Sequence, residues 1–325
     1  MLQIRRLVTP AFVNEMEKLC PGGVHINVNL ANLSRWRIGG TADCILRPAS
    51  TEQLATTIRY FNDYDVPYVV IGATSNLLFA DEGLQVPCIQ IGSSLSKLSI
   101  REDTVYAQAG VWVPGLARRI MQAGLTGAEH ICGIPGTLGG LVYMNGGSQR
   151  KGIGSVVASI ESVDARGNIH YRNTEQCEFS YRSSVYQNNT EVVTKVKLVL
   201  SPGDKARVRK NMLNILASRN KKFPRKLPSC GSVFKSNPTL YAAIGPPGAV
   251  IERMGFKGVR CGGAVVSSEH ANFIVNSGGA RASDVLSLVK KIQASLAESF
   301  GCKLEAEAIY VSPAGELVTL DEKIQ

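Results

Sequence analysis

Apolar residues in the N-terminal part of the chain follow first the period of a helix and then that of a short strand. In STEQLATTIRYFNDYDVP, Leu54, Ile58 and Phe61 recur at positions i, i+4 and i+7, which predicts an amphipathic helix. Ser50 and Gln53 fit a capping box at its start. The apolar run YVVIG that follows predicts a buried strand, so the order here is β-α-β.

The middle of the chain alternates apolar and polar residues over several short runs. VWVPGLARRIMQAGL is a helical candidate, whereas SVVASIESVDARGNIHYR predicts two strands around an Asp-Ala-Arg-Gly turn. TEVVTKVKLVLSP predicts a further strand by the same alternation. These runs therefore predict three strands after the first β-α-β unit.

The composition shifts near residues 201–205, SPGDK, and we expect a second unit from about residue 202. A basic amphipathic helix, a serine-bearing loop, the strand HANFIVN and a long helix follow, and KLEAEAIYVS predicts a closing strand. In the long helix Ser283 can provide the N-cap and Gly301 the end. Its apolar face is formed by Val285, Leu288, Val289, Ile292 and Leu296.

Length and cysteine usage narrow the class of protein. With 325 residues the chain is long enough for two or three domains. It has no apolar run of membrane-spanning length and a poor signal-peptide start, so we expect a cytoplasmic protein. The eight cysteines are scattered, which predicts free thiols, and neither they nor the four histidines have metal-ligand spacing. We therefore expect no metal site.

The formal net charge of +10 raises the question of an anionic partner. The basic residues are dispersed apart from RVRKNM and SRNKKFPRK, between residues 207 and 226, and these runs carry one aromatic, Phe223. A solvated helix face or a small phosphate- or carboxylate-bearing ligand accounts for them better than nucleic acid, for which no binding module is recognisable.

Two glycine-rich stretches are the first candidates for chemistry. VIGATSNLLFADEG (70–83) follows a predicted strand, so its backbone N–H groups could cradle a phosphate. CGIPGTLGGLVYMNGGS (132–148) holds enough glycine to force a close backbone approach to something. Neither matches a P-loop or a well-placed G-x-G-x-x-G. Tight turns and close helix packing remain the alternative for each stretch alone.

The two stretches belong to a set of eight short motifs. In chain order these are RIGGTAD (37–43), GATSNLL (72–78), GIPGTLGG (133–140), MNGG (144–147), YRSS (181–184), GSVFKSNP (231–238), HANFIVN (270–276) and LEAEA (304–308). In this order they resemble the UDP-N-acetylenolpyruvoylglucosamine reductase family over residues 30 to 312. The resemblance implies an α+β chain with an FAD-binding fold of the vanillyl-alcohol-oxidase type and a C-terminal α+β substrate-binding domain. The short stretch between Arg182 and Ser232 resembles the subclass that lacks a tyrosine-bearing loop.

The resemblance also implies the division of labour along the chain. Residues 1–201 form the FAD-binding domain, in two subdomains of about 30–95 and 96–201, and bind FAD non-covalently. Residues 202–325 form the substrate-binding domain, and whether its final strand returns to the FAD-binding domain is left open. The first glycine loop takes the pyrophosphate and the second lies along the isoalloxazine. The implied cofactor-binding residues are Gly72, Ala73, Thr74, Ser75, Asn76, Gly133, Ile134, Pro135, Gly136, Thr137, Gly139 and Gly140.

For the reaction, the resemblance implies reduction of UDP-N-acetylglucosamine enolpyruvate to UDP-N-acetylmuramate with NADPH, by a monomer that binds neither nucleic acid nor membrane. Ser232, in PSCGSVFKSNP, is the implied proton donor, and Arg182 with Glu307 polarises the substrate carboxylate. A glutamate facing a carboxylate would repel it unless its pKa were raised. The implied substrate-binding residues are Lys222, Asn237 and Tyr181.

Taken singly, these residues have ordinary interpretations. Ser232 would be a turn hydroxyl, Glu307 part of a solvated strand face, and Arg182 a surface cation. A nucleophilic serine is disfavoured because CGSVF is not G-x-S-x-G and no partner histidine is evident. Only the joint match favours the catalytic interpretation.

Three positions differ from the family pattern. Ala73 stands where a glycine is usual, which a negative φ would accommodate, Ser236 is an extra residue before Asn237, and NLANLSRWRIGG replaces a threonine-rich approach. Two alternatives therefore stay open. One is a paralogue that reduces a related nucleotide-sugar enol ether for a surface polysaccharide, and the other is an FAD or nucleotide-sugar binder without turnover.

Overall fold

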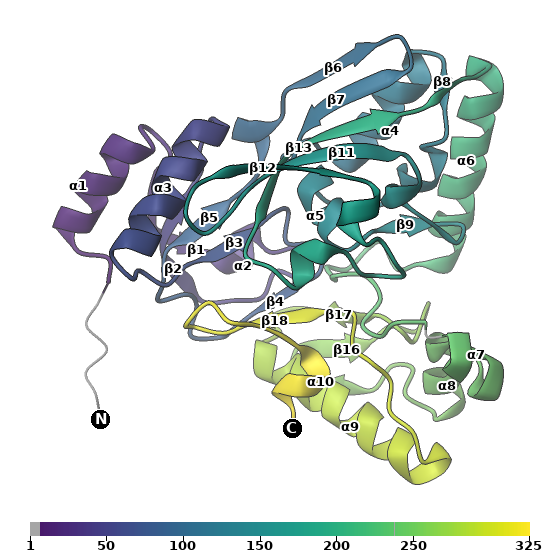
Figure 1. The fold of residues 1–325 in the computed structure, drawn as a ribbon. Helices are drawn as coiled ribbons and strands as arrows, with labels where there is room; N and C mark the ends of the chain where they lie inside the picture. The colour runs from purple at the N-terminus through teal and green to yellow at the C-terminus, as the bar shows by residue number, and fades with distance from the viewer. Residues whose placement is uncertain (1–6, 237) are drawn as a thin grey trace. The chain divides into compact units, whose positions relative to one another are not determined.

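The computed structural model describes residues 7–236 and 238–325. The chain forms two compact units and passes between them more than once. The first unit contains the residues up to His25, Ile45–Ala73 and Pro87–Arg219, and the second contains Ile26–Cys44, Thr74–Val86 and Asn220–Gln325. Both units mix helices and strands (Figure 1), which confirms the predicted α+β class. The boundary expected near residue 202 stays a prediction.

The first unit is built on an antiparallel sheet with the strand order β12-β11-β13-β7-β6. The two strands predicted around Asp-Ala-Arg-Gly are β11 (Val157–Val163) and β12 (Ile169–Asn173), and they pair with Val163 opposite Ile169. The third predicted strand is β13 (Val192–Val199), which joins β11 to β7 (Thr104–Gln108). The alternation in the sequence therefore predicted three neighbouring strands correctly.

The predicted β-α-β order is also present. Helix α3 (Thr51–Asp63) buries Leu54, Ile58 and Phe61. Ser50 is its N-cap and accepts a hydrogen bond from the Gln53 backbone N–H, but the Gln53 side chain accepts from Ala49 and not from Ser50. Strand β3 (Val69–Ile71) follows and pairs in parallel with β5 (Cys88–Gln90), which in turn pairs in parallel with β2 (Thr41–Leu46).

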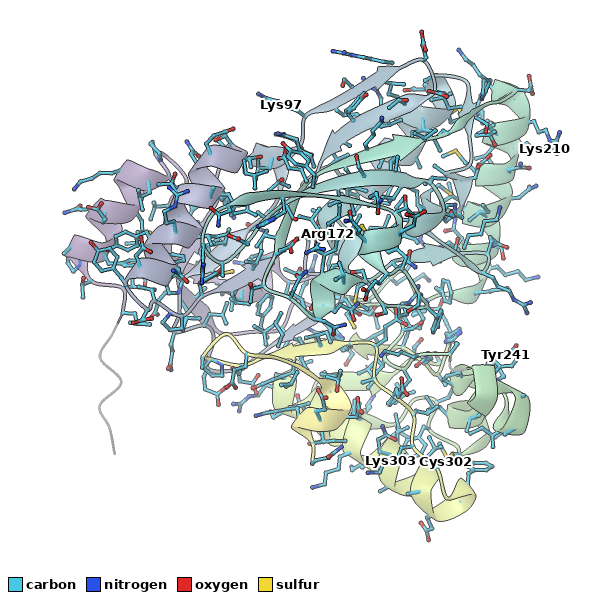
Figure 2. All side chains as sticks on the ribbon, in the orientation of Figure 1. Lys97, Arg172, Lys210, Tyr241, Cys302 and Lys303 are labelled. Atoms are coloured by element: carbon cyan, nitrogen blue, oxygen red, sulfur yellow. The ribbon has the colours of Figure 1, made fainter. Side chains whose placement is uncertain are left out.

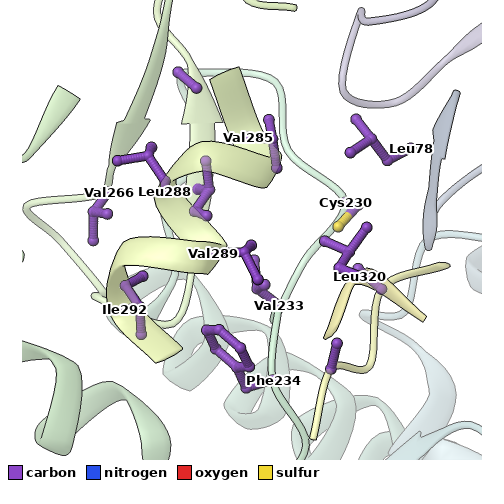
Figure 3. Packing of buried hydrophobic residues seen from close by; sticks show 14 of the residues in the cluster. Leu78, Cys230, Val233, Phe234, Val266, Val285, Leu288, Val289, Ile292 and Leu320 are labelled. Atoms are coloured by element: carbon purple, nitrogen blue, oxygen red, sulfur yellow. The ribbon is translucent and has the colours of Figure 1, made fainter. Parts of the chain in front are cut away.

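The second unit surrounds its longest helix, α9 (Ala282–Phe300). The predicted apolar face of α9 is fully buried and packs in one cluster with residues that include Val233 and Phe234 (Figure 3). Strand β18 (Ile309–Val311) pairs in parallel with β4 (Leu77–Phe79) and antiparallel with β19 (Leu317–Thr319). A second small sheet has the order β15-β16-β17.

The start of α9 differs from the expectation. Gly301 ends the helix in the left-handed region, as predicted, but Ser283 lies inside the helix and the N-cap is Arg281. The carboxylate of Asp81 accepts the N–H groups of Ala282 and Ser283. Asp81, which is distant in sequence, therefore accepts the N–H groups at the start of α9 that a serine N-cap would otherwise accept.

The remaining elements of the first unit are short apart from α6, which ends at the start of the second. Lys210 on α6 points away from the rest of its unit (Figure 2), and most basic residues of this helix are exposed, as a solvated face requires. These elements are α1 (Pro10–Leu19), β1 (Val24–Asn29, of which residues 26–29 belong to the second unit), η1 (Ser93–Leu95), β6 (Leu98–Arg101), α4 (Val113–Gln122), β8 (Leu125–Thr126), η2 (Glu129–Ile131), α5 (Leu138–Tyr143), β9 (Gly147–Ser148), β10 (Lys151–Gly152), η3 (Ile153–Ser155), η4 (Glu175–Cys177), η5 (Val185–Gln187), β14 (Ser201–Pro202) and α6 (Lys205–Lys222).

The remaining elements of the second unit lie mainly between residues 238 and 276. The closing segment expected as one strand is regular only over β18, although Leu304, Ala306 and Ala308 are buried and alternate with more exposed residues. The other elements are α2 (Leu30–Leu33), α7 (Pro238–Ile244), α8 (Pro247–Arg253), β15 (Arg260–Cys261), β16 (Ala264–Val266), β17 (Ile274–Asn276) and α10 (Leu320–Lys323).

The described residues offer neither a membrane-spanning helix nor a metal-binding cluster. None of the helices there combines the length and the apolar character that crossing a membrane requires. Within the same residues, no group of three or more His, Cys, Asp or Glu side chains is arranged to hold a metal ion. All eight cysteines are free thiols, as predicted, and six of them are buried.

Candidate active site

The two glycine loops, predicted separately, meet within the first unit. A Cβ atom added to Gly72 would lie 2.5 Å from Oγ1 of Thr137, closer than real side-chain contacts allow. Thr137 is buried and precedes α5, whereas Gly72 follows β3. The missing side chain of Gly72 is therefore what lets the first loop reach the second.

The second loop is fastened to the end of β7. The N–H groups of Leu138 and Gly139 donate to the carbonyls of Val111 and Ala109, at 2.9 and 2.8 Å. A Cβ at Gly139 would lie 3.0 Å from Cβ of Ala109, so a glycine suits this position. Gly136 has a φ of +151° and its carbonyl accepts the N–H of Val113. These contacts hold the loop rigidly beside the sheet.

The left-handed residue of the first loop is Thr74, with a φ of +54°, and not Ala73. This places the backbone strain one residue after the alanine, so the methyl group of Ala73 is tolerated as expected. The Thr74 hydroxyl donates to the Leu33 carbonyl and accepts the Arg35 N–H. Its side chain thus shapes the loop, and its peptide group is the part suited to a ligand.

Arg219 of α6 lies across the second glycine loop. A Cβ at Gly133 would lie 2.7 Å from Cδ of Arg219, which explains the glycine there. Burial lowers the pKa of Arg219, and the positive charge of Arg182 lowers it further. Both arginines belong to the first unit, to which they contribute positive charge.

Arg182 is carried by a tight turn in the first unit. Ser180 and Ser183 exchange backbone hydrogen bonds across it, and Arg182 itself has a φ of +55°. The Arg182 guanidinium lies 5.3 Å from the ring centre of Tyr181, whose side chain is 53% exposed. Asn145, from the MNGG motif, donates to the Ser180 carbonyl and steadies the turn. Left-handed non-glycine residues of this kind often mark functional sites.

Ser232 and Glu307 lie together in the second unit. The N–H of Glu307 donates a 2.7 Å hydrogen bond to the carbonyl of Val233, the residue after Ser232. The Asn76 side chain donates to the Glu307 carbonyl at 2.7 Å. Two causes raise the pKa of the Cys230 thiol: burial, which is the larger, and the negative charge of Glu307. The Glu307 carboxylate therefore lies near this loop.

The other predicted substrate residues are placed as follows. Lys222 is exposed at the end of α6. Asn237 lies outside the described residues, and Ser236 before it is exposed. Lys235 forms an ion pair with Glu305 at 3.6 Å, and its N–H donates to the Glu305 carbonyl. The strand segment that carries Glu307 therefore runs along the serine loop for several residues.

The part of the first unit around Gly72 and Thr137 fits FAD. Glycine backbone without side chains lies there beside the start of α5, as a flavin and its pyrophosphate need. A covalent flavin bond would be made by a histidine or a cysteine, and both candidates near the second loop, His130 and Cys132, contact backbone carbonyls instead. Nε2 of His130 lies 3.2 Å from the Gly152 carbonyl, and Sγ of Cys132 is directed at the Met212 carbonyl, with its pKa raised by burial.

Two family profiles match the chain. The profile described as "FAD binding domain" covers residues 42–171, which include both glycine loops. The profile described as "UDP-N-acetylenolpyruvoylglucosamine reductase, C-terminal domain" covers residues 223–311, which include Ser232 and Glu307. Arg182 lies between the two matched regions.

Curated relatives match over most of the chain. UDP-N-acetylenolpyruvoylglucosamine reductase 1 of Corynebacterium glutamicum is 41% identical over 289 residues, 89% of this chain and 86% of the relative. The chain belongs to the UDP-N-acetylenolpyruvoylglucosamine reductase family. The reductase of Carboxydothermus hydrogenoformans is 36% identical over 90% of this chain and 95% of its own length. The predicted family is thus confirmed, and the chain is an FAD-dependent oxidoreductase.

A solved structure of the family has the same fold. The UDP-N-acetylenolpyruvylglucosamine reductase of Thermus caldophilus superposes with a TM-score of 0.75, at 31% identity, over 87% of this chain and 97% of the other. The fold expected from the resemblance is therefore confirmed over most of the chain.

Sequence reasoning missed several residues that shape this site. Arg219, Asn145 and Asn272 were not singled out, although the last two stand inside the motifs MNGG and HANFIVN. Their neighbours in the site are distant in sequence, so no local pattern could identify their partners. The motif positions were the available signal.

Proposed function

We propose that this chain reduces UDP-N-acetylglucosamine enolpyruvate to UDP-N-acetylmuramate with NADPH, as a step in peptidoglycan precursor synthesis. Ser232 is the proton donor, and Arg182 and Glu307 act on the substrate carboxylate. The observation that carries this assignment is the 2.7 Å hydrogen bond from the Glu307 N–H to the carbonyl of Val233, the residue after Ser232, which joins the backbone segments that carry Ser232 and Glu307.

The reduction requires a group that donates a proton to the substrate α-carbon and a cation that stabilises the negative charge on the substrate carboxylate. When bound, FAD reduced by NADPH supplies the hydride that adds to the enol ether. Negative charge then develops on the substrate α-carbon and its carboxylate, where a fixed guanidinium stabilises it. The O–H bond of Ser232 breaks as its proton moves to the α-carbon, whose electron pair forms the new C–H bond. Water then returns a proton to the serine oxygen.

The substrate supplies several anionic groups for the cations described above. We assign the carboxylate to Arg182, held in its tight turn, and contacts with the nucleotide-sugar to Lys222, Tyr181 and Asn237. We assign FAD to the two glycine loops, because Gly72 and Thr137 bring them together. The Arg182–Arg219 pair offers a second positive position near the second loop.

We also propose that the enzyme works in the cytoplasm as a monomer. Eight free cysteines suit a reducing compartment, where thiols stay reduced. The nucleotide-linked substrate and NADPH are metabolites of the same compartment. Sedimentation at several protein concentrations tests the monomer, and a single species of about the chain's mass is expected.

The test of the function is NADPH oxidation by the purified yellow protein. We expect oxidation that depends on the enolpyruvyl sugar nucleotide and yields one product heavier than it by two hydrogens. Arg182→Lys should weaken the reaction because lysine lacks the bidentate geometry for a carboxylate. Turnover with another nucleotide-sugar enol ether but none with this substrate would indicate the paralogue, and flavin binding without any turnover would indicate a binder.

A further inference from the structure

The loop that carries Ser232 is held on one side by a single buried asparagine, Asn272. The Val233 N–H donates to the Asn272 carbonyl, and the Phe234 N–H donates to Asn272 Oδ1, both at 2.9 Å. The Asn272 Nδ2 group donates back to the Phe234 carbonyl, also at 2.9 Å. Asn272 is 4% exposed, so these bonds are shielded from water.

The two sides of Ser232 are therefore restrained differently. On its N-terminal side Gly231 has a φ of +94°, and a Cβ there would meet no atom within 4 Å. On its C-terminal side Val233 and Phe234 are buried, and the peptide groups of both are bonded to Asn272. The direction of the serine side chain thus depends mainly on the Asn272 side.

The peptide group between Val233 and Phe234, next to Ser232, is bonded to both Asn272 and Glu307. Its N–H, from Phe234, donates to Asn272 Oδ1 at 2.9 Å, while its carbonyl, from Val233, accepts the Glu307 N–H at 2.7 Å and the Ala308 N–H at 3.3 Å. A shift of this peptide would change the position of Ser232 against Glu307. The hydrogen bonds of Asn272 fix it from the side opposite Glu307.

We propose that Asn272 is a positioning residue for proton transfer, which holds the Val233–Phe234 peptide so that Ser232 and Glu307 keep their relative placement. The proposal rests on the assigned role of Ser232. Asn272 does not touch the substrate in this proposal, and it acts only through the serine loop. A shift of about 1 Å at a reacting group can cost on the order of 10²-fold in rate.

A merely structural asparagine is the competing explanation, and the chain offers a matched control. Gln293 of α9, which is 8% exposed, also forms hydrogen bonds to the backbone with both the oxygen and the nitrogen of its side-chain amide. It donates to the Leu304 carbonyl and accepts the Leu304 N–H. Asn272→Asp and Gln293→Glu each replace the amide donor by an oxygen that faces a carbonyl, within the same unit.

The experiment compares these two variants in the holoenzyme by melting temperature, hydrogen exchange and stopped-flow half-reactions. Both variants should melt at a lower temperature. Only Asn272→Asp should speed exchange in a peptide covering residues 230–236 and slow flavin reoxidation by the enolpyruvyl substrate, by about 10- to 100-fold. Flavin reduction by NADPH should stay within about 2-fold in both variants, because that step uses no proton from Ser232.

Coupling with Ser232 decides between positioning and general stability. In a Ser232→Ala background, Asn272→Asp should cause little further loss of reoxidation, since the group it positions is gone. An equal loss in both backgrounds, unchanged exchange at residues 230–236, or the same slowing by Gln293→Glu would overturn the proposal. Asn272→Ser, which keeps the backbone bond to Val233, serves if Asn272→Asp does not fold. If Ser232→Ala itself keeps full reoxidation, the proton-donor role fails instead.

Discussion

The N–H of Glu307 donates a 2.7 Å hydrogen bond to the carbonyl of Val233, the residue that follows Ser232. Two residues far apart in the sequence are thereby joined through one peptide group. The Asn76 side chain, from the first glycine loop, bonds to the Glu307 carbonyl within the same unit. Backbone hydrogen bonds thus bring together the segments that carry a carboxyl group and a hydroxyl group.

Ser232→Ala should separate the two half-reactions. Flavin reduction by NADPH should be almost unchanged, because it requires no proton from Ser232, whereas reoxidation by the enolpyruvyl substrate should fall by about 10²–10⁴-fold. Ser232→Cys should retain more activity than alanine, since a thiol can donate a proton. Stopped-flow flavin absorbance measures both steps. Equal loss in the two steps would mean that Ser232 supports the fold or the flavin.

Gly72→Ala should weaken FAD binding, because its Cβ would lie 2.5 Å from Thr137 Oγ1. Overpacking of this kind costs about 1–3 kcal/mol, or roughly a 5- to 150-fold rise in the Kd of FAD. Thr137→Ala should restore part of the binding, since the next Thr137 atom is 3.7 Å away. Flavin fluorescence titration of the apoprotein checks this. Gly115→Ala, on α4, is the control and should bind FAD normally; failure of Thr137→Ala to rescue would refute the clash.

FAD should be released intact by acid precipitation. His130 and Cys132 are the nearest candidates for a covalent bond in the second loop, and both are buried against backbone carbonyls. Yellow colour should therefore appear in the supernatant after trichloroacetic acid treatment. Cys132→Ser should give the same result as the unmodified chain. Colour that stays in the pellet would show covalent attachment, and its loss from the pellet of Cys132→Ser would assign the bond to Cys132.

The free energy of unfolding should fall as the pH is lowered from 7 to 5, partly through His270. Burial lowers the pKa of His270, and the charge of Lys257 lowers it further. The folded state therefore takes up a proton less readily than the unfolded state, whose histidine has a pKa of about 6.5. Stability from this group is complete above that pH and is lost below it.

His270→Asn tests this, because its amide oxygen can replace Nδ1, which accepts the Asn272 N–H at 3.2 Å. Urea unfolding at pH 7, 6 and 5 should give a smaller decrease for the variant. Some decrease should persist, since burial also lowers the pKa of His25 and His130. Identical pH dependence of the two proteins would show that His270 does not contribute.

Glu161→Gln should destabilise the first unit. Oε1 of Glu161 accepts the hydroxyls of Thr51 and Thr194, and Oε2 accepts Tyr171 and Lys195. With the amide oxygen facing the two buried threonines, the NH2 group faces the Tyr171 hydroxyl and the Lys195 ammonium, so the bonds of these partly exposed donors to a charged acceptor are lost, at about 1 kcal/mol. Urea unfolding measures the loss, with Glu298→Gln, on the exposed face of α9, expected within about 0.5 kcal/mol of the unmodified chain. Equal stability of both variants would contradict the assignment.

The sequence by itself determined the elements whose causes are local. The apolar face of α9, the Ser50 cap of α3, the two strands around Asp-Ala-Arg-Gly and the strand β13 depend on residues a few positions apart, and all are present as predicted. The family, and with it FAD, followed from eight short motifs in order. Periodicity and motif order survive in the one-dimensional sequence because neighbouring positions carry them.

Only the tertiary structure decided the partners of these elements. Asp81 caps α9 in place of Ser283, Thr74 and not Ala73 takes the left-handed conformation, and Asn272 bonds to the loop of Ser232. Each of these depends on which distant segment packs beside the residue, because a hydrogen bond or a clash is set by distance in space. The chain alone contains no local signal for such pairs, so the placement of Ser232 beside Glu307 emerged only from the fold.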